Sequence, residues 1–404
     1  MLLVQFQVSV LAYNSMYLVD GVNLIRDKRL NTEYVCQLML IENICIRYLM
    51  FMLQRQNIAR LMDKCQRLWT RLKSNEVWSY VRPFERRVYF YRNFSLVISY
   101  LVIVLFVAGS QLTHLAPDRI NGTARRKLPY SYYYDVQEDP DFSIISGIQG
   151  LILCYTAIIL AGIDTIAPFL IMLACGYSVT LKNRLLNMAH KDDKSTKVNN
   201  QLIYGDVIEC AKFHREIMSY CQDIENHMRS FHMVIMICNV YNMSLIGIQI
   251  LQNIEYFFQY SSLLAMHFMQ LYLSQWAPDH LLHETKAIGN AAYFATLGHS
   301  TYNHQANKIL QIMMLRAHCK PVQLTAGGYI KLSMETFGKV NIFLFSIKTV
   351  EKFNAYTQFF SDDNQCGFYV YSCSKFYFVK IYILNIIFIF LVIKQLEFHM
   401  HEII

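Results

Sequence analysis

Residues 308 to 337 read KILQIMMLRAHCKPVQLTAGGYIKLSMETF, and these thirty residues say most about the fold. In the first half, Ile309, Ile312 and Met313 recur at helical spacing, and Arg316 follows near the end of the run. This pattern predicts an amphipathic helix with a basic end. Pro321 should stop that helix, because proline has no backbone N–H to donate.

The second half of the stretch predicts a turn and then a new helix. The run Thr-Ala-Gly-Gly at 325–328 breaks the helical pattern. Ser333 is a suitable N-cap, and Glu335 falls in the first turn of the apolar helix that follows, where the exposed amides and the helix dipole favour a carboxylate. We therefore expect a helix outside the membrane to lead into a membrane helix through a glycine hinge.

This stretch resembles the signature near the C-terminus of insect odorant receptors. That pattern is an Arg-Ala pair, Lys-Pro, a Leu-Thr-Ala-Gly run and a Leu-Ser-x-Glu-Thr-Phe start to the last helix. The matching residues are Arg316, Ala317, Lys320, Pro321, Leu324, Thr325, Ala326, Gly327, Leu332, Ser333, Glu335, Thr336 and Phe337. The resemblance implies that the hinge and the start of the pore helix comprise Pro321, Thr325, Gly327, Ser333, Glu335, Thr336 and Phe337. The alternative is a chance helix-turn-helix at a membrane surface.

Composition independently indicates a membrane protein. Hydrophobic residues make up 54% of the chain and charged residues only 16%, above and below the usual values for soluble proteins. The eleven cysteines are scattered without a CxxC pair, which argues against a disulfide framework and structural zinc. The net charge of +8 concentrates beside the apolar runs, so it reflects membrane topology and not binding to nucleic acid.

The apolar runs predict an all-α polytopic protein embedded in a lipid bilayer. Seven transmembrane helices are expected at about 1–19, 34–53, 94–116, 143–179, 231–251, 256–276 and 333–355. The fourth run is too long for the hydrocarbon layer alone, so its helix must project beyond the lipid or bend at Pro168. Helical extensions are expected at 54–93, 182–230 and 277–320.

The distribution of Lys and Arg predicts the orientation. The three extensions hold 10, 8 and 4 of these residues, whereas the connections 20–33, 110–141 and 253–255 hold 3, 4 and 0. By the positive-inside rule the extensions are cytoplasmic, and so is the N-terminus. That orientation is opposite to G-protein-coupled receptors and is also what the resemblance implies.

Charged residues inside the spans are the strongest polar signals. Glu42 and Arg47 in the second span must face protein or water. Asp164 in the fourth span either has a partner or reaches solvent near the cytoplasmic end. His280, His283 and Glu284 do not form a metal-ligand pattern, and no catalytic or cofactor motif is present, so we predict neither an enzyme nor a cofactor.

Function follows from the resemblance. Members of the family are odorant-binding subunits of ligand-gated cation channels in the plasma membrane of olfactory neuron dendrites. They form hetero-tetramers with a co-receptor subunit and bind a small volatile odorant. The resemblance implies a mostly apolar pocket among the outer halves of the second, third, fourth and sixth spans, and the three extensions packed together as an anchor. Candidate lining residues, for which ordinary helix packing is the alternative, are Tyr34, Gln111, His114, Gln149, Tyr155 and Tyr260.

The 110–141 connection adds two weaker signals. Asn121 begins an Asn-Gly-Thr glycosylation sequon, which is usable only outside the cell. The tyrosine run at 130–134 either caps the outer end of the helices or binds aromatic ligands, and we favour the cap.

The resemblance fades after Phe337. Residues 1–337 are predicted to form the seven-helix membrane domain, whose last helix continues to about 355, whereas 338–404 is an atypical tail. The apolar run 376–393 is either an eighth span or, as we favour, part of a translated intron that begins at Gly-Lys-Val. Rival functions are an insect gustatory receptor, whose last-helix motif the segment 356–359 does not reproduce, and a transporter, for which internal repeats are expected but missing.

Overall fold

The computed structural model describes residues 32–71, 75–112, 128, 138, 140–189, 197–252, 257–297 and 304–342. The chain up to Phe337 forms one compact unit, and Gly338 begins a second. Several predicted features lie outside the described residues: the first span, His114, the sequon at Asn121, the tyrosine run and the apolar run at 376–393.

The described chain is almost entirely helical, which confirms the predicted fold class. The helices are α2 (Thr32–Arg71), α3 (Asn75–Leu112), α4 (Asp141–Ala189), α5 (Lys197–Gln252), α6 (Phe257–Leu297) and α7 (His304–Cys319), followed by a helix at 334–342. Two short strands, β1 (Thr325–Ala326) and β2 (Ile330–Lys331), lie between α7 and that last helix. Each of α2 to α6 overlaps one predicted span and also includes part of a more polar extension.

Length shows that these helices extend well beyond a bilayer. Helix α4 has 49 residues and runs on through Pro168. At about 1.5 Å per residue it is roughly 75 Å long, against roughly 30 Å of hydrocarbon. The helix is therefore longer than the hydrocarbon layer, as the sequence predicted; its position relative to the lipid and a bend at Pro168 stay predictions.

Four described helices, α2 to α5, are long and apolar enough to cross a membrane. Helix α6 contains the predicted sixth span but falls outside this group. Within that span it carries Gln259, His267 and Gln270, and these polar side chains lower its hydropathy. His267 and Gln270 also line a cavity between helices.

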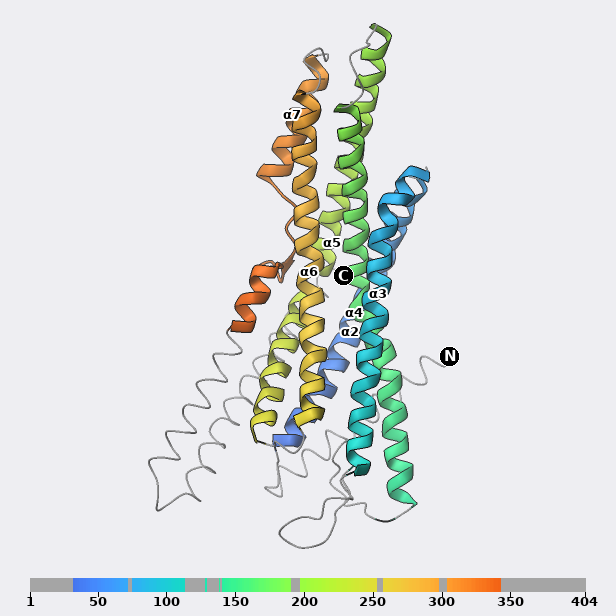
Figure 1. Cartoon of the computed structure of the whole chain (residues 1–404), viewed down its shortest axis with the longest axis vertical. Helices are drawn as coiled ribbons and strands as arrows, with labels where there is room; N and C mark the ends of the chain where they lie inside the picture. The colour runs from blue at the N-terminus through green and yellow to red at the C-terminus, as the bar shows by residue number, and fades with distance from the viewer. Residues whose placement is uncertain are drawn as a thin grey trace, which may run out of the picture. The chain divides into compact units, whose positions relative to one another are not determined.

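Helix α4 packs against α3 and α6, and also contacts α2 and α5. Figure 1 shows α3, α4 and α6 running side by side along much of their length. One apolar cluster of the core joins α2, α3, α5 and α6 through Cys36, Val102, Leu245, Ile246, Tyr260 and Leu263. These residues lie within the predicted spans, where the lipid is as apolar as the core, so van der Waals packing and hydrogen bonds between helices hold them together there.

The predicted extensions pack together within the chain, as expected. Lys64 of α2 donates to Ser219 of α5 at 2.9 Å and pairs with Asp223 of the same helix. Between α4 and α6, Lys182 and Glu284 form an ion pair at 3.0 Å. These contacts join helices that lie far apart in the sequence.

Helix α7 is amphipathic and basic at its end, and it stops just before Pro321, as predicted. Its predicted apolar face is wrong in part, because Ile312 is 57% exposed. The buried stripe is Ala306, Leu310, Met313 and Ala317. The small Gly289 of α6 lies against Ala317 and His318, so the alanine side of α7 allows the closest approach of the two helices.

The Thr-Ala-Gly-Gly run forms an antiparallel hairpin, which the sequence did not predict. Thr325 pairs with Lys331 and Ala326 with Ile330. Gly327 and Gly328 have φ angles of 64° and 84°. Only glycine adopts such angles without strain, and this explains why the helical pattern breaks here.

Candidate functional site

A cavity of about 90 Å³ lies between four helices, α2, α3, α4 and α6. These helices overlap the second, third, fourth and sixth predicted spans; the pocket that the resemblance implies in the outer halves of those spans stays a prediction. The lining residues are Leu40, Asn43, Ile44 and Arg47 of α2, Ser95, Ser99, Val102 and Ile103 of α3, Leu153, Thr156, Ala157, Leu160 and Ala161 of α4, and Leu263, Met266, His267 and Gln270 of α6.

Helical periodicity explains the apolar walls. On each helix the lining residues recur three or four positions apart, so that they share one face. Several polar side chains in the walls use their hydrogens within the protein. Thr156 donates to the carbonyl of Ile152 at 2.7 Å, and Ser99 donates to the sulfur of Met266 at 3.8 Å. The walls are therefore mostly hydrocarbon, with few free donors.

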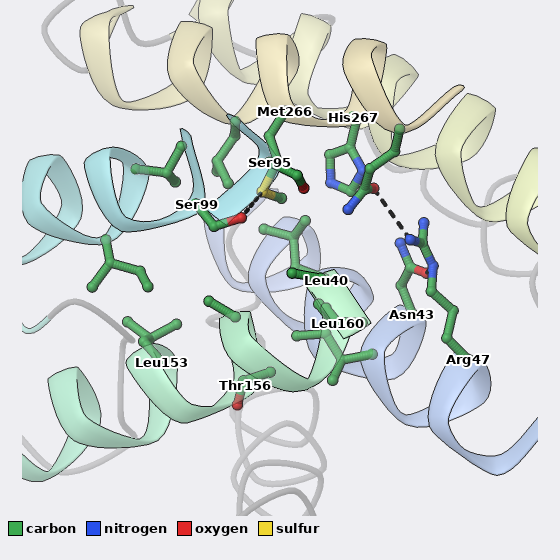
Figure 2. A pocket seen from close by; sticks show the side chains of 17 residues that line it. Leu40, Asn43, Arg47, Ser95, Ser99, Leu153, Thr156, Leu160, Met266 and His267 are labelled. Carbon is green, nitrogen blue, oxygen red and sulfur yellow. Dashed lines mark hydrogen bonds between the residues drawn. The ribbon is translucent and has the colours of Figure 1, made fainter. Parts of the chain in front are cut away.

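One side of the cavity is polar and is organised by Arg47, whose side chain is 1% exposed. Its Nε donates to Asn43 Oδ1 at 2.7 Å, and its Nη1 donates to Gln270 Oε1 at 3.2 Å. Its Nη2 donates to Asn239 Oδ1 at 2.6 Å. Figure 2 shows Asn43 and Arg47 reaching from α2 toward His267 of α6.

Asp164 of α4 balances this buried cation. Both of its carboxylate oxygens accept from Arg47 Nη1, at 3.0 and 2.9 Å. Gln270 Nε2 donates to the same carboxylate at 2.9 Å. The sequence left two interpretations of Asp164 open, and the structure selects the one with a partner. A charge placed in a low-dielectric interior is tolerated only when it is paired and hydrogen-bonded in this way.

His267 lies at the junction between the polar side and the apolar walls. Its Nδ1 is 3.1 Å from Asn239 Oδ1. Its Nε2 is buried and has no hydrogen-bond partner within the described part of the chain. The cavity thus combines apolar walls with a small polar face, an arrangement that suits a small organic molecule with one polar group.

None of the four predicted lining residues whose side chains the structure describes, Tyr34, Gln149, Tyr155 and Tyr260, borders this cavity. Tyr34 is buried beside Ile41 and Leu153, and Tyr260 packs against the Val102 and Leu263 cluster, so both support lining residues from behind. Gln149 is buried on α4 and Tyr155 is partly buried. The side chain of Gln111 and all of His114 lie outside the described residues. A ligand-binding role for these six stays a prediction.

The sequence analysis missed Asn239, His267 and Gln270. A signal for them exists, because each is a polar side chain within a predicted apolar span. Polar residues at such depth need partners, and this requirement could have paired them with Arg47 and Asp164.

The residues of the family motif lie in the hairpin and on both sides of it in the sequence, and the cavity lining includes none of them. Thr325 donates to Glu225 of α5 through its amide at 2.8 Å and through its hydroxyl. The amide of Gly327 donates to the carbonyl of Arg229 at 2.9 Å. The predicted hinge is therefore bonded to α5 on one side.

The start of the last described helix is bonded to α6. The Ser333 hydroxyl accepts from the Thr336 amide at 3.2 Å, so Ser333 is the N-cap that the sequence predicted. The Ser333 amide donates to Gln275 at 3.0 Å, and the Met334 amide donates to Asp279 at 3.4 Å. Phe337 packs edge-on against Phe268 and Tyr272 of α6.

Comparison with known proteins gives a family match and two solved structures with a similar fold. The family model described as 7tm Odorant receptor matches residues 32–345. A solved structure of the insect olfactory receptor OR5 from Machilis hrabei is similar, with a TM-score of 0.64 and 11% identity over 84% of this chain and 85% of that one. The same receptor in complex with eugenol gives a TM-score of 0.63 and 12% identity, over 84% and 86% of the two chains.

Such low identity shows a shared fold only. A search of the curated proteins finds no match. The family model, however, covers well over half of the sequence, from the start of α2 to beyond the hairpin. This polytopic membrane protein belongs to the 7tm odorant receptor family.

Proposed function

We propose that this chain is the odorant-binding subunit of a ligand-gated cation channel, and that the cavity beside His267 is its odorant site. The observation that carries the proposal is the cavity itself, which lies between helices of the matched region and has apolar walls with one polar side. The similar receptor from Machilis hrabei is described in complex with eugenol, a small organic molecule, which supports a ligand of this kind.

Cavity size limits the ligand. The volume is about 90 Å³. An apolar cavity of roughly 150 Å³ can hold benzene, and sites for drug-sized ligands measure roughly 300–1,000 Å³. We therefore expect compact volatile molecules of about the size of benzene, bound with a small outward movement of the walls.

The assembly in this proposal is a hetero-tetramer with a co-receptor subunit in the plasma membrane of an olfactory neuron dendrite. The distribution of Lys and Arg supports a cytoplasmic N-terminus. The helix that begins after Ser333 would line the conduction path. Opening requires the odorant to bind the open state more tightly than the closed state, because only a difference in affinity shifts such an equilibrium.

Electrical recording tests this function. Cells that express the chain together with a co-receptor should give cation currents when a panel of small volatile compounds is applied, and cells with the co-receptor alone should not respond to the same compounds. If the chain reaches the plasma membrane with its co-receptor but stays silent across a broad panel, the proposal is wrong.

A further inference from the structure

The hydrogen atoms around Arg47 can be assigned from chemistry alone. An arginine side chain only donates hydrogen bonds. Its Nη2 lies 2.6 Å from Asn239 Oδ1, so that atom is the acceptor and the amide of Asn239 cannot be turned around. The Asn239 Nδ2 group is buried and has no hydrogen-bond partner among the described residues.

The orientation of Asn239 then fixes the tautomer of His267. The same Oδ1 atom is 3.1 Å from His267 Nδ1. Because an amide oxygen cannot donate, Nδ1 must carry the hydrogen. In a neutral imidazole the other nitrogen, Nε2, then presents a lone pair and accepts.

The surroundings favour the neutral ring. Asp164, the carboxylate of this cluster, is already bonded to Arg47 and Gln270. A charged imidazole would place a second buried cation beside the guanidinium and would leave its Nε2–H without an acceptor. His267 Nε2 is therefore a buried acceptor that no described residue satisfies with a hydrogen bond.

This acceptor belongs to the cavity. His267 is 3% exposed and lines the cavity, whereas its partner Asn239 does not. Figure 2 shows the imidazole projecting from α6 among the lining side chains. A buried acceptor without a partner is costly, and a ligand hydrogen that reaches it removes that cost.

We propose that His267 makes this site selective for ligands that donate a hydrogen bond, namely small alcohols and phenols. The inference rests on the proposed odorant site. A ketone, aldehyde or ether of similar size offers only lone pairs, which Nε2 repels, so it can be held only by a donor elsewhere in the lining, such as Asn43 Nδ2. A hydrocarbon fits the walls and leaves Nε2 unsatisfied. The site therefore binds an alcohol more tightly than a hydrocarbon or a ketone of the same size.

Three ligands with the same number of heavy atoms test this order: cyclohexanol, cyclohexanone and methylcyclohexane. Dissociation constants are measured with the full chain in lipid nanodiscs, from the rise in the thermal unfolding midpoint with ligand concentration. We expect cyclohexanol to bind about tenfold more tightly than either of the others, since one net hydrogen bond is worth about that factor. Equal or tighter binding of cyclohexanone overturns the inference.

The variant His267→Phe keeps an aromatic ring but removes the acceptor. Within this variant, cyclohexanol should bind no more than about twofold more tightly than methylcyclohexane. A preference for the alcohol that survives in His267→Phe assigns the acceptor elsewhere and overturns the inference. If the variant does not fold, the comparison of three ligands in the parent protein still decides.

The outcomes separate this inference from the proposed function. If all three ligands bind equally well, the cavity is a binding site and the selectivity by His267 is wrong. If none of them binds to the folded chain, the site itself is wrong, and the inference fails with it.

Discussion

Arg47 of α2 and Asp164 of α4 form a buried ion pair across 117 positions of the sequence, with Nη1 2.9 Å from the nearer carboxylate oxygen. The pair also joins α5 and α6, because Asn239 and Gln270 complete the hydrogen bonds of the guanidinium. One arginine thereby connects four helices beside the cavity. Neither charge would be tolerated in lipid without the other.

Removing one member of this pair should be strongly destabilising. We expect Arg47→Met to lower the free energy of unfolding by about 3–5 kcal/mol, because Asp164 is then left as an uncompensated buried charge. The double variant Arg47→Met with Asp164→Leu should recover part of this loss. Thermal unfolding of the chain in nanodiscs measures both effects.

The exposed pair of Lys64 and Asp223 provides the matched control for that experiment. Its side chains are 30% and 35% exposed. Lys64→Met should therefore cost only about 0–1 kcal/mol. Similar losses for Arg47→Met and Lys64→Met would contradict a structural role for the buried pair.

The two hairpin glycines should respond differently to alanine. Both have positive φ angles, so either substitution should cost about 1–2 kcal/mol in backbone strain. A Cβ at Gly327 would also lie 3.3 Å from Met233 of α5, whereas nothing lies within 4 Å of one at Gly328. We expect Gly327→Ala to lower the thermal midpoint more than Gly328→Ala does, and Met233→Ala to reduce the difference. Equal midpoints would show that the Met233 side chain makes room for the added methyl group without cost.

Filling the cavity should abolish ligand binding without unfolding the protein. Ala161 lines the cavity and is 4% exposed. Ala161→Phe should reduce the affinity for the compounds that activate the parent by more than about tenfold, at an overpacking cost of about 1–3 kcal/mol. Concentration–response curves recorded with the co-receptor measure this change.

Ile158 is the control on the same helix. It is 51% exposed and does not line the cavity. Ile158→Phe adds a ring of the same size where there is space for it, so the concentration–response curve should not move. A loss of affinity in both variants would place the binding site elsewhere.

His280 should make the stability of the α3–α6 contact depend on pH. It stacks on Trp276, with 5.9 Å between ring centroids, and lies beside Phe84. Burial lowers the pKa of His280 below its ordinary value, although Glu284 acts in the opposite direction. As the pH falls below roughly 6.5, the unfolded chain gains a proton at this histidine before the folded chain does, so stability decreases until the folded pKa is passed.

The variant His280→Phe tests the source of this decrease. It keeps the aromatic stack and removes the titrating group. Its thermal midpoint should therefore fall less than that of the parent when the pH is lowered from about 7.5 to about 5.5. An unchanged pH dependence would mean that other groups account for it.

The sequence was sufficient for the spans in α2 to α5 and for the N-cap at Ser333, because hydropathy, periodicity and capping are local properties of a few neighbouring residues. The extended length of α4 followed in the same way. By contrast, the buried stripe of α7 depends on where Gly289 of α6 allows close approach, and this contact joins separate helices. The face predicted for α7 was wrong in part for that reason.

The polar side of the cavity could be predicted only in part. Arg47 and Asp164 were conspicuous as charges within apolar runs, and the need for a partner was evident for both. Which residues meet, however, depends on the axial alignment and rotation of four helices. The choice of polar residues such as Tyr34 and Tyr260 as lining was uncertain because a tyrosine can equally pack behind a cavity wall, and these two do.

Gln275 of α6 has a further consequence. It lies five residues after Gln270, which borders the cavity, and it accepts a hydrogen bond from the amide of Ser333. Along a continuous helix this separation is only about 8 Å. A ligand that displaces α6 by even a fraction of an ångström therefore moves the first residue of the last described helix directly, and no long relay through the protein is required.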